Sequence, residues 1–293
     1  MADALRTPDE RFAGLPDFPF QARYRDVAGL RLAHLDEGEG PPVVLFHGEP
    51  TWSFLWRKVI PPLRDAGFRC IVPDLVGFGR SDKPTDVGWY SYDRHVALAA
   101  SLLEDLDLRD ATLVLHDWGG AIGLRIAVER AERVTRLALM DTGIWTGRQR
   151  MSDAWWKFRD FVERTEDVPI GLLVRRACHQ DPGDEVIAGY EAPFPTPESK
   201  AGARAFPLLI PHQPDAPGAA EGRATLEAIS ADPPPMLVLW ADADPVLPLE
   251  TGERVAAALG HDGIDHVVAG AGHFLQEDRG EEIGATIADW LRA

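Results

Sequence analysis

The stretch that decides the fold reads Thr112-Leu113-Val114-Leu115-His116-Asp117-Trp118-Gly119-Gly120. A short apolar run is followed by a polar residue and two glycines, and residues 121–129 then carry apolar side chains at helical spacing. This order predicts a strand, a tight turn and a helix, which together form a nucleophile elbow with Asp117 at its apex.

An aspartate at the apex of an elbow has a specific chemical consequence. Most elbows carry serine there, and serine must be activated by a base. The carboxylate of Asp117 is already anionic at neutral pH, so it can attack a saturated carbon directly and displace a leaving group. The product is an ester of the protein itself, which water must then cleave. The alternative is that Asp117 only caps the following helix.

Outward from the elbow, short apolar runs alternate with longer helix-like segments. The runs are typical of strands buried on both faces, and they are Val43–Phe46, Cys70–Pro73, Thr112–Leu115, Val134–Met140, Met236–Trp240 and His266–Val268. Arg94–Leu106, Ala121–Glu129 and Glu281–Leu291 have the spacing of crossover helices. Tyr24–Val27 and Leu30–Leu35 predict an antiparallel hairpin at the sheet edge. We therefore expect an α/β fold with a mostly parallel sheet flanked by helices.

The alternation stops after Asp141, and residues 145–225 are irregular, helix-like and rich in proline. We interpret this segment as a helical cap inserted between two strands of one sheet. The expected organisation is a core of residues 1–144 and 226–293 with a cap of residues 145–225.

Composition excludes several classes of partner. The formal net charge of −17 repels nucleic acid and anionic lipid. Cys70 and Cys178 form neither a disulfide framework nor a zinc pattern. The first residues do not resemble a signal peptide, and no apolar run approaches the roughly 18 residues of a membrane span. We expect a cytoplasmic protein that uses no metal and no cofactor.

Two further segments supply the partners that a nucleophilic Asp117 requires. His273, in Gly270-Ala271-Gly272-His273-Phe274, follows the last short strand, where this arrangement places its general base. Asp244 follows the Met236–Trp240 strand and is the favoured acid to orient His273. Asp141, at the end of the preceding strand, is the rival for that role, and Asp242 is interpreted as a loop carboxylate.

A third segment, His47-Gly48-Glu49-Pro50, follows the first central strand. Backbone N–H groups of Glu49 and of Trp118 would form an oxyanion hole. That hole would be used when water attacks the ester carbonyl.

In these residues the sequence resembles the haloalkane dehalogenases, a branch of the α/β-hydrolase family. The likeness covers nearly the whole chain and is carried by His47–Ser53, Pro73–Pro84, His116–Gly120, Tyr190–Pro195 and Gly272–Asp278. It implies that a small apolar haloalkane and water react to give an alcohol and a halide ion. Asp117 would attack the halogen-bearing carbon, and His273, held by Asp244, would activate the water.

The resemblance also implies a halide site with two donors. Trp118 would offer its indole N–H, which can only donate. One branch of the family uses an asparagine for the second donor, but Glu49 stands there and is expected to be an anion that repels halide. The other branch uses a tryptophan of the cap. An ungapped comparison puts Phe158 at that position, so a shifted helix would have to supply Trp156, which we favour, or Trp155.

Two other interpretations of the same residues remain. Epoxide hydrolases share the Asp–His–Asp chemistry but usually need two cap tyrosines, and only Tyr190 lies in this cap, against Trp145, Trp155 and Trp156. A non-catalytic ligand-binding protein of the same fold would have no need for a nucleophile, a base and an oriented acid together. A dehalogenase of fluoroacetate type would need cationic groups for its carboxylate substrate, whereas the elbow continues with Trp118.

Overall fold

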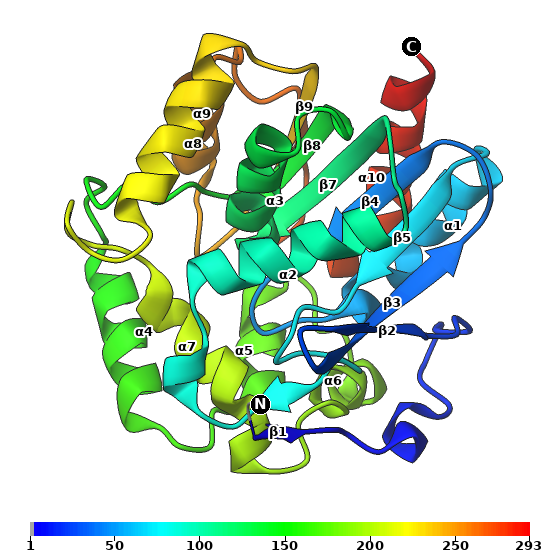
Figure 1. Cartoon of the computed structure of the whole chain (residues 1–293), viewed down its shortest axis with the longest axis vertical. Helices are drawn as coiled ribbons and strands as arrows, with labels where there is room; N and C mark the ends of the chain where they lie inside the picture. The colour runs from blue at the N-terminus through cyan, green and yellow to red at the C-terminus, as the bar shows by residue number, and fades with distance from the viewer. Residues whose placement is uncertain (1–2) are drawn as a thin grey trace.

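Eight strands form one twisted sheet in the order β10-β9-β8-β7-β4-β5-β3-β2 (Figure 1). The structure is a computed structural model that describes residues 3–293, the side chain of Ala154 excepted. The strands are β2 (Arg23–Val27), β3 (Leu30–Glu37), β4 (Pro42–Phe46), β5 (Arg69–Pro73), β7 (Ala111–Asp117), β8 (Val134–Thr142), β9 (Met236–Ala241) and β10 (His266–Val268). From β5 to β10 all neighbours are parallel, and β3 and β2 add an antiparallel edge.

Helices cover both faces of this sheet. One face carries the 3-10 helix η2 (Ser53–Lys58), α1 (Ile60–Asp65) and α10 (Leu275–Arg292), which pack against one another. The other carries α2 (Tyr92–Asp105), α3 (Trp118–Glu129) and α8 (Ala219–Ala231), with α9 (Leu249–Ala258) beside β8 and β9. In Figure 1, α2 and α3 lie in front of the strands and α10 lies behind them.

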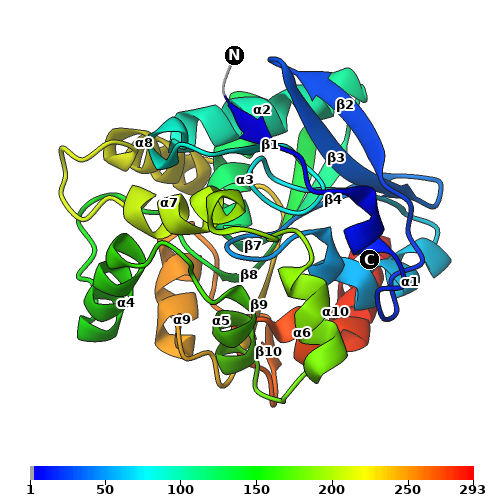
Figure 2. The ribbon, with the colours of Figure 1, turned by 90° about the horizontal axis from the view of Figure 1, so that it is seen from below.

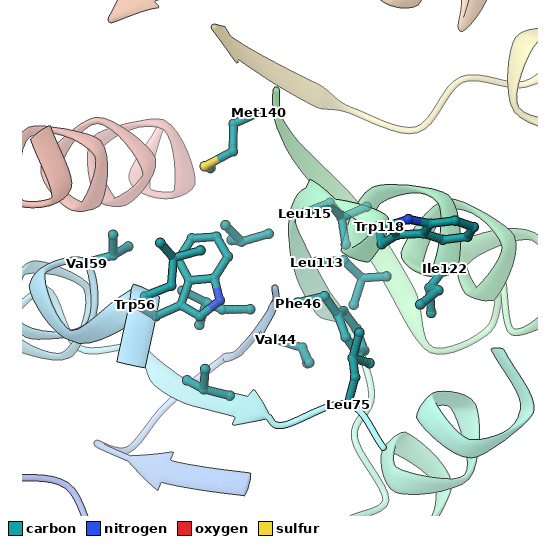
Figure 3. Packing of buried hydrophobic residues seen from close by; sticks show 14 of the residues in the cluster. Val44, Phe46, Trp56, Val59, Leu75, Leu113, Leu115, Trp118, Ile122 and Met140 are labelled. Atoms are coloured by element: carbon teal, nitrogen blue, oxygen red, sulfur yellow. The ribbon is translucent and has the colours of Figure 1, made fainter. Parts of the chain in front are cut away.

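The apolar strand residues explain this layering, because both of their faces must be covered. Figure 3 shows Trp56 and Val59 on one side of the sheet and Ile122 of α3 on the other, with Leu113 between them. All four side chains are fully buried. Burial of a side chain of this size stabilises the fold by about 1.5–3 kcal/mol relative to exposure.

The cap follows β8 and consists of α4 (Asp153–Arg164), α5 (Ile170–Ala177), α6 (Asp184–Glu191), the 3-10 helix η4 (Pro197–Lys200) and α7 (Ala201–Leu209). In Figure 2, α5 and α6 lie in front of the strand ends, and α4 and α7 lie to their left. Phe206 of α7 contacts Trp118, which follows β7, at a ring distance of 5.0 Å. The carbonyl of Ala177 accepts a 2.8 Å hydrogen bond from the backbone N–H of His273, which follows β10. The helices inserted between β8 and β9 therefore lie over the carboxyl ends of the parallel strands.

Short elements complete the chain. A small antiparallel pair joins β1 (Ala4–Leu5) to β6 (Lys83–Pro84), and two 3-10 turns, η1 (Asp9–Phe12) and η3 (Val87–Trp89), lie in the loops. None of the helices within residues 3–293 is both long and apolar enough to cross a lipid bilayer.

The predicted fold class is confirmed, including the parallel sheet and the edge hairpin. The cap boundary expected at residue 225 falls inside α8, which packs against α3 of the core. Apolar side chains of α8 face the core, which the proline-rich composition before it concealed. We propose that the cap ends at Gly218, whose left-handed backbone (φ 86°) turns the chain into α8.

Candidate active site

The elbow places Asp117 at the junction of β7 and α3 in a backbone conformation that few residues other than glycine adopt (φ 49°, ψ −125°). Two glycines make room for it. A Cβ on Gly48 would lie 2.0 Å from Oδ1 of Asp117, and a Cβ on Gly120 would lie 1.7 Å from Oγ1 of Thr142. The side chain of Asp117 makes no capping hydrogen bond to α3. The strained turn therefore aims the carboxylate away from the helix, as expected at a functional site.

Asp117, His273 and Asp244 come together from three different loops. Nδ1 of His273 lies 2.8 Å from Oδ2 of Asp244, and Nε2 of His273 lies 3.6 Å from Oδ2 of Asp117. The backbone N–H of Val246 donates to Oδ1 of Asp244 at 2.6 Å. Because a carboxylate only accepts hydrogen bonds, Nδ1 carries the proton between His273 and Asp244. The imidazole is thus oriented with Nε2 toward Asp117.

The second oxygen of Asp117 faces the loop after β4. The backbone N–H of Glu49 donates to Oδ1 of Asp117 at 2.8 Å. The backbone N–H of Trp118 also faces this carboxyl and lowers its pKa. The two N–H groups expected for an oxyanion hole therefore lie on the same carboxyl group.

The tryptophans expected at the halide site are not all brought together. Trp118 is buried, and its ring contacts Trp145 at 4.3 Å and Phe206 at 5.0 Å. On α4, Trp156 is 40% exposed and packs its ring against His212, whereas Trp155 has a buried Nε1 with no hydrogen-bond partner among the described residues. Among the described ring contacts, neither α4 indole touches Trp118.

Comparison with known proteins agrees with this geometry. Residues 41–280 match a family model described as alpha/beta hydrolase fold. A haloalkane dehalogenase of Mycolicibacterium paratuberculosis is 44% identical over 296 residues, covering 99% of this chain and 98% of that protein. One from Psychrobacter cryohalolentis is 41% identical, with 98% and 97% covered. The solved structure of haloalkane dehalogenase DpaA from Paraglaciecola agarilytica NO2 superposes with a TM-score of 0.89 at 35% identity, with 97% of each chain covered.

This chain belongs to the haloalkane dehalogenases.

Electrostatics in the dehalogenase site centre on a charged pair. Burial opposes the charge of His273, but Asp244 and Asp117 together raise its pKa well above the usual value. Burial also opposes the charge of Asp117, yet the nearby imidazole of His273 holds the pKa of that carboxyl below its usual value. With Asp117 free, the site therefore favours an imidazolium facing a carboxylate.

The surroundings of Glu49 oppose the charge that its residue type suggests. Burial, followed by the charge of Asp117, raises the pKa of Glu49 well above its ordinary value, while the charge of His273 acts in the opposite direction. Its Oε1 is buried and has no hydrogen-bond partner within residues 3–293. The sequence could not show this, because burial and the neighbouring carboxylate, which together make a second negative charge costly, follow from the fold.

The two other carboxylates near the base lie apart from His273 but in well-defined contacts. Asp242 accepts hydrogen bonds from the backbone N–H groups of Gly270 and Ala271, at 2.8 and 3.3 Å, and so holds the loop before His273. Asp141, fully buried at the end of β8, accepts the N–H of Ala241 at 3.2 Å.

Sequence reasoning missed the contact that fastens the cap. The buried Tyr190 of α6 donates its hydroxyl proton to Glu277 of α10 at 2.8 Å, and Arg57 pairs with Glu277 through two 2.7 Å hydrogen bonds. Both Tyr190 and Glu277 lie within the segments that carry the family likeness, so their positions were available. Their pairing was not, because 87 residues separate them.

The sequence placed Trp145 among the cap tryptophans but did not mark it as a halide-site candidate, although its ring lies 4.3 Å from that of Trp118. No periodicity marks it, since it lies in the irregular segment after β8.

Proposed function

We propose that this dehalogenase hydrolyses haloalkanes in two steps through an ester on Asp117. The observation that carries the proposal is that the two oxygens of Asp117 have different neighbours. Oδ1 accepts the N–H of Glu49 at 2.8 Å, while Oδ2 faces Nε2 of His273 at 3.6 Å. One oxygen is held by the backbone, and the other is left to react beside a base.

In the first step, Oδ2 of Asp117 attacks the carbon that bears the halogen. The new C–O bond forms as the carbon–halogen bond breaks, and its electron pair leaves with the halide ion. No proton moves, so no base is required. The leaving halide needs hydrogen-bond donors in an apolar pocket because an unsolvated anion is costly there.

In the second step, water attacks Cγ of the Asp117 ester. His273 takes a proton from the water, and the developing negative charge on Oδ1 is stabilised by the N–H groups of Glu49 and Trp118. Collapse of this intermediate releases the alcohol with Oδ2 and restores the carboxylate. Asp244 stabilises the imidazolium that forms.

The ester itself prepares His273 to act as a base. In the free enzyme, Asp244 and the nearby carboxylate of Asp117 both raise the pKa of His273. Alkylation removes that charge, so the imidazole loses a proton more readily when the hydrolytic step begins. The base therefore becomes available after the nucleophile has been used.

For the halide we propose Trp118 as one donor and an α4 indole as the other. A buried indole N–H without a partner favours Trp155 over the exposed Trp156, the reverse of the order preferred from sequence. Movement of α4 toward Trp118 on substrate binding would have to bring the two donors together.

The tyrosines argue against an epoxide substrate. The hydroxyl of Tyr190 is bound to Glu277, that of Tyr92 to the carbonyl of Ala121, and that of Tyr90 to the carbonyl of Pro84, each at 2.8 Å. Tyr24 lies on the edge strand β2 and is 39% exposed. None of the four is free in this structure to protonate an epoxide oxygen at Asp117.

A single-turnover reaction in oxygen-18 water tests the proposal. With enzyme in excess over 1-bromobutane, the first alcohol should carry ordinary oxygen from Asp117, and bromide should be released in equal amount. Direct attack by water would instead label the alcohol at once and overturn the ester mechanism. Styrene oxide in a parallel reaction should give no diol.

A further inference from the structure

Asp141 is an extra residue in β8. In the β7–β8 pairing His116 lies opposite Met140 and Asp117 opposite Thr142, so Asp141 has no partner and forms a bulge. Its backbone is left-handed, with a φ of 37°. Bulges beside active sites re-aim a side chain, and this one directs a fully buried carboxyl toward the N–H of Ala241 in β9.

At that position the carboxyl of Asp141 is buried beside that of Asp244, close enough for the two charges to interact. Two ionised carboxylates that share a buried site repel each other, so ionisation of one favours the protonated form of the other. Asp244 already accepts from Val246 at 2.6 Å and from Nδ1 of His273 at 2.8 Å, and both contacts favour its anion. Asp141 accepts one backbone N–H, from Ala241, at 3.2 to 3.3 Å.

We propose that Asp141 is a protonated positioning residue, which donates a hydrogen bond to Asp244 and so fixes the carboxylate that orients His273. The inference rests on the proposed function for its catalytic consequence only. Burial, then the charge of Asp244, raises the pKa of Asp141 well above its ordinary value, while the charge of His273 acts in the opposite direction. The site thus contains a line of four groups, with Asp141 behind the acid and Asp117 in front of the base.

The proposal assigns two hydrogen bonds to Asp141, one accepted and one donated. Asp141→Asn can make both and has the same shape, but it carries no titratable proton. Asp141→Leu has a similar volume and can make neither. In wild type, ionisation of Asp141 at alkaline pH would place a second anion against Asp244, so the proposal predicts an alkaline loss of activity that Asp141→Asn lacks.

Infrared spectroscopy tests the proton directly and without turnover. Wild type at neutral pH should show the carbonyl band of a carboxylic acid, and Asp141→Asn should lose it. Glu49, whose pKa is also raised, would give a second band, and Glu49→Gln identifies that one. If Asp141→Asn leaves the acid bands unchanged, Asp141 is ionised and the proposal is overturned, whatever the substrate of the enzyme.

Kinetics test the positioning role. Asp141→Asn should keep kcat within about threefold, whereas Asp141→Leu should slow hydrolysis of the covalent ester about 10- to 100-fold, the cost of losing a hydrogen bond to a charged group. Bromide release in the first step should change little. Equal losses in both variants would contradict the proposal, because only the ionised carboxylate would then serve. If Asp141→Leu fails to fold, the infrared bands and the pH profile of Asp141→Asn decide.

Discussion

The elbow and helix α4 differ in how their polar groups are held. At the elbow, Asp117 and Asp244 accept backbone N–H groups at 2.8 and 2.6 Å, and His273 contacts Asp244 at 2.8 Å. On α4, Nε1 of Trp155 and Nη1 of Arg159 are buried without a partner, and Trp156 and Phe161 are 40% and 42% exposed. The reacting groups are held by hydrogen bonds before substrate binds. The helix expected to contact the halide has buried polar atoms without hydrogen-bond partners and exposed aromatic rings.

Removing the nucleophile from the elbow should cause the largest loss of turnover. Asp117→Ala should lower haloalkane turnover by several orders of magnitude, as loss of a nucleophile does in serine enzymes. Bromide release from 1-bromobutane measures the loss, and circular dichroism should show an unchanged fold. Asp65→Ala, on an exposed carboxylate paired with Arg64, is the control and should leave turnover unchanged. Full activity in Asp117→Ala would mean that the residue only shapes the elbow.

Removing the base should separate the two steps. His273→Gln should still form the ester but should not hydrolyse it, because displacement requires no base. Mass spectrometry after a pulse of 1-bromobutane should find a butyl group on the peptide that contains Asp117. An inactive variant without an adduct would place His273 in the first step.

The charge of Asp117 should also be readable in the titration of His273. In wild type, Asp244 and Asp117 raise the pKa of His273 well above its usual value, so the imidazole keeps its proton to a higher pH than a free imidazole does. Asp117→Ala removes one of these charges, as the ester does, and the pKa should fall. NMR titration of the imidazole measures the change. Since a raised pKa stabilises the fold until pH rises through it, wild type should lose more stability than the variant on alkaline titration. An unchanged pKa would show that Asp117 does not prepare the base.

These experiments concern a region that sequence patterns could predict. Strand ends, glycine-rich turns and the order of Asp117, Asp244 and His273 are local features, and the parallel sheet brings its strand ends to one edge. The positions of the α4 tryptophans depend instead on how one helix packs on its neighbours, which no spacing records. The bulge at Asp141 was likewise not predicted from the sequence. An extra residue in a strand is recognised only from the pairing with the neighbouring strand.

Substitutions of the tryptophans at the proposed halide site should have intermediate effects on halide binding and bromide release. Iodide should quench tryptophan fluorescence saturably, and Trp118→Phe should remove most of the response and slow bromide release. Trp155→Phe should have a smaller effect of the same kind, and Trp156→Phe should mainly change the signal of an exposed ring. Trp145→Phe should reveal whether the ring nearest to Trp118 reports on the halide. If all three cap variants keep the quenching of wild type, the second donor lies outside this group.

The smallest effect should come from the cap's attachment to the core. Tyr190→Phe loses a buried hydrogen bond to an ionised Glu277, worth about 1.5–3 kcal/mol in the free energy of unfolding. Urea denaturation measures this change, and Tyr24→Phe on the exposed edge strand is the control. A variant as stable as wild type would indicate that Arg57 and Lys58 hold Glu277, and the cap with it, on their own.

Because of that buried attachment, the cap has one helix that protein engineering should leave unchanged, α6, and one that it can vary, α4. Helix α6 is tied to α10 through Tyr190 and Glu277, only four residues after His273, so changes there disturb the base together with the cap. Helix α4 has no such tie among the contacts described above. A library of variants confined to residues 153–164 would therefore alter the substrate range while leaving the relative positions of the acid, the base and the nucleophile unchanged.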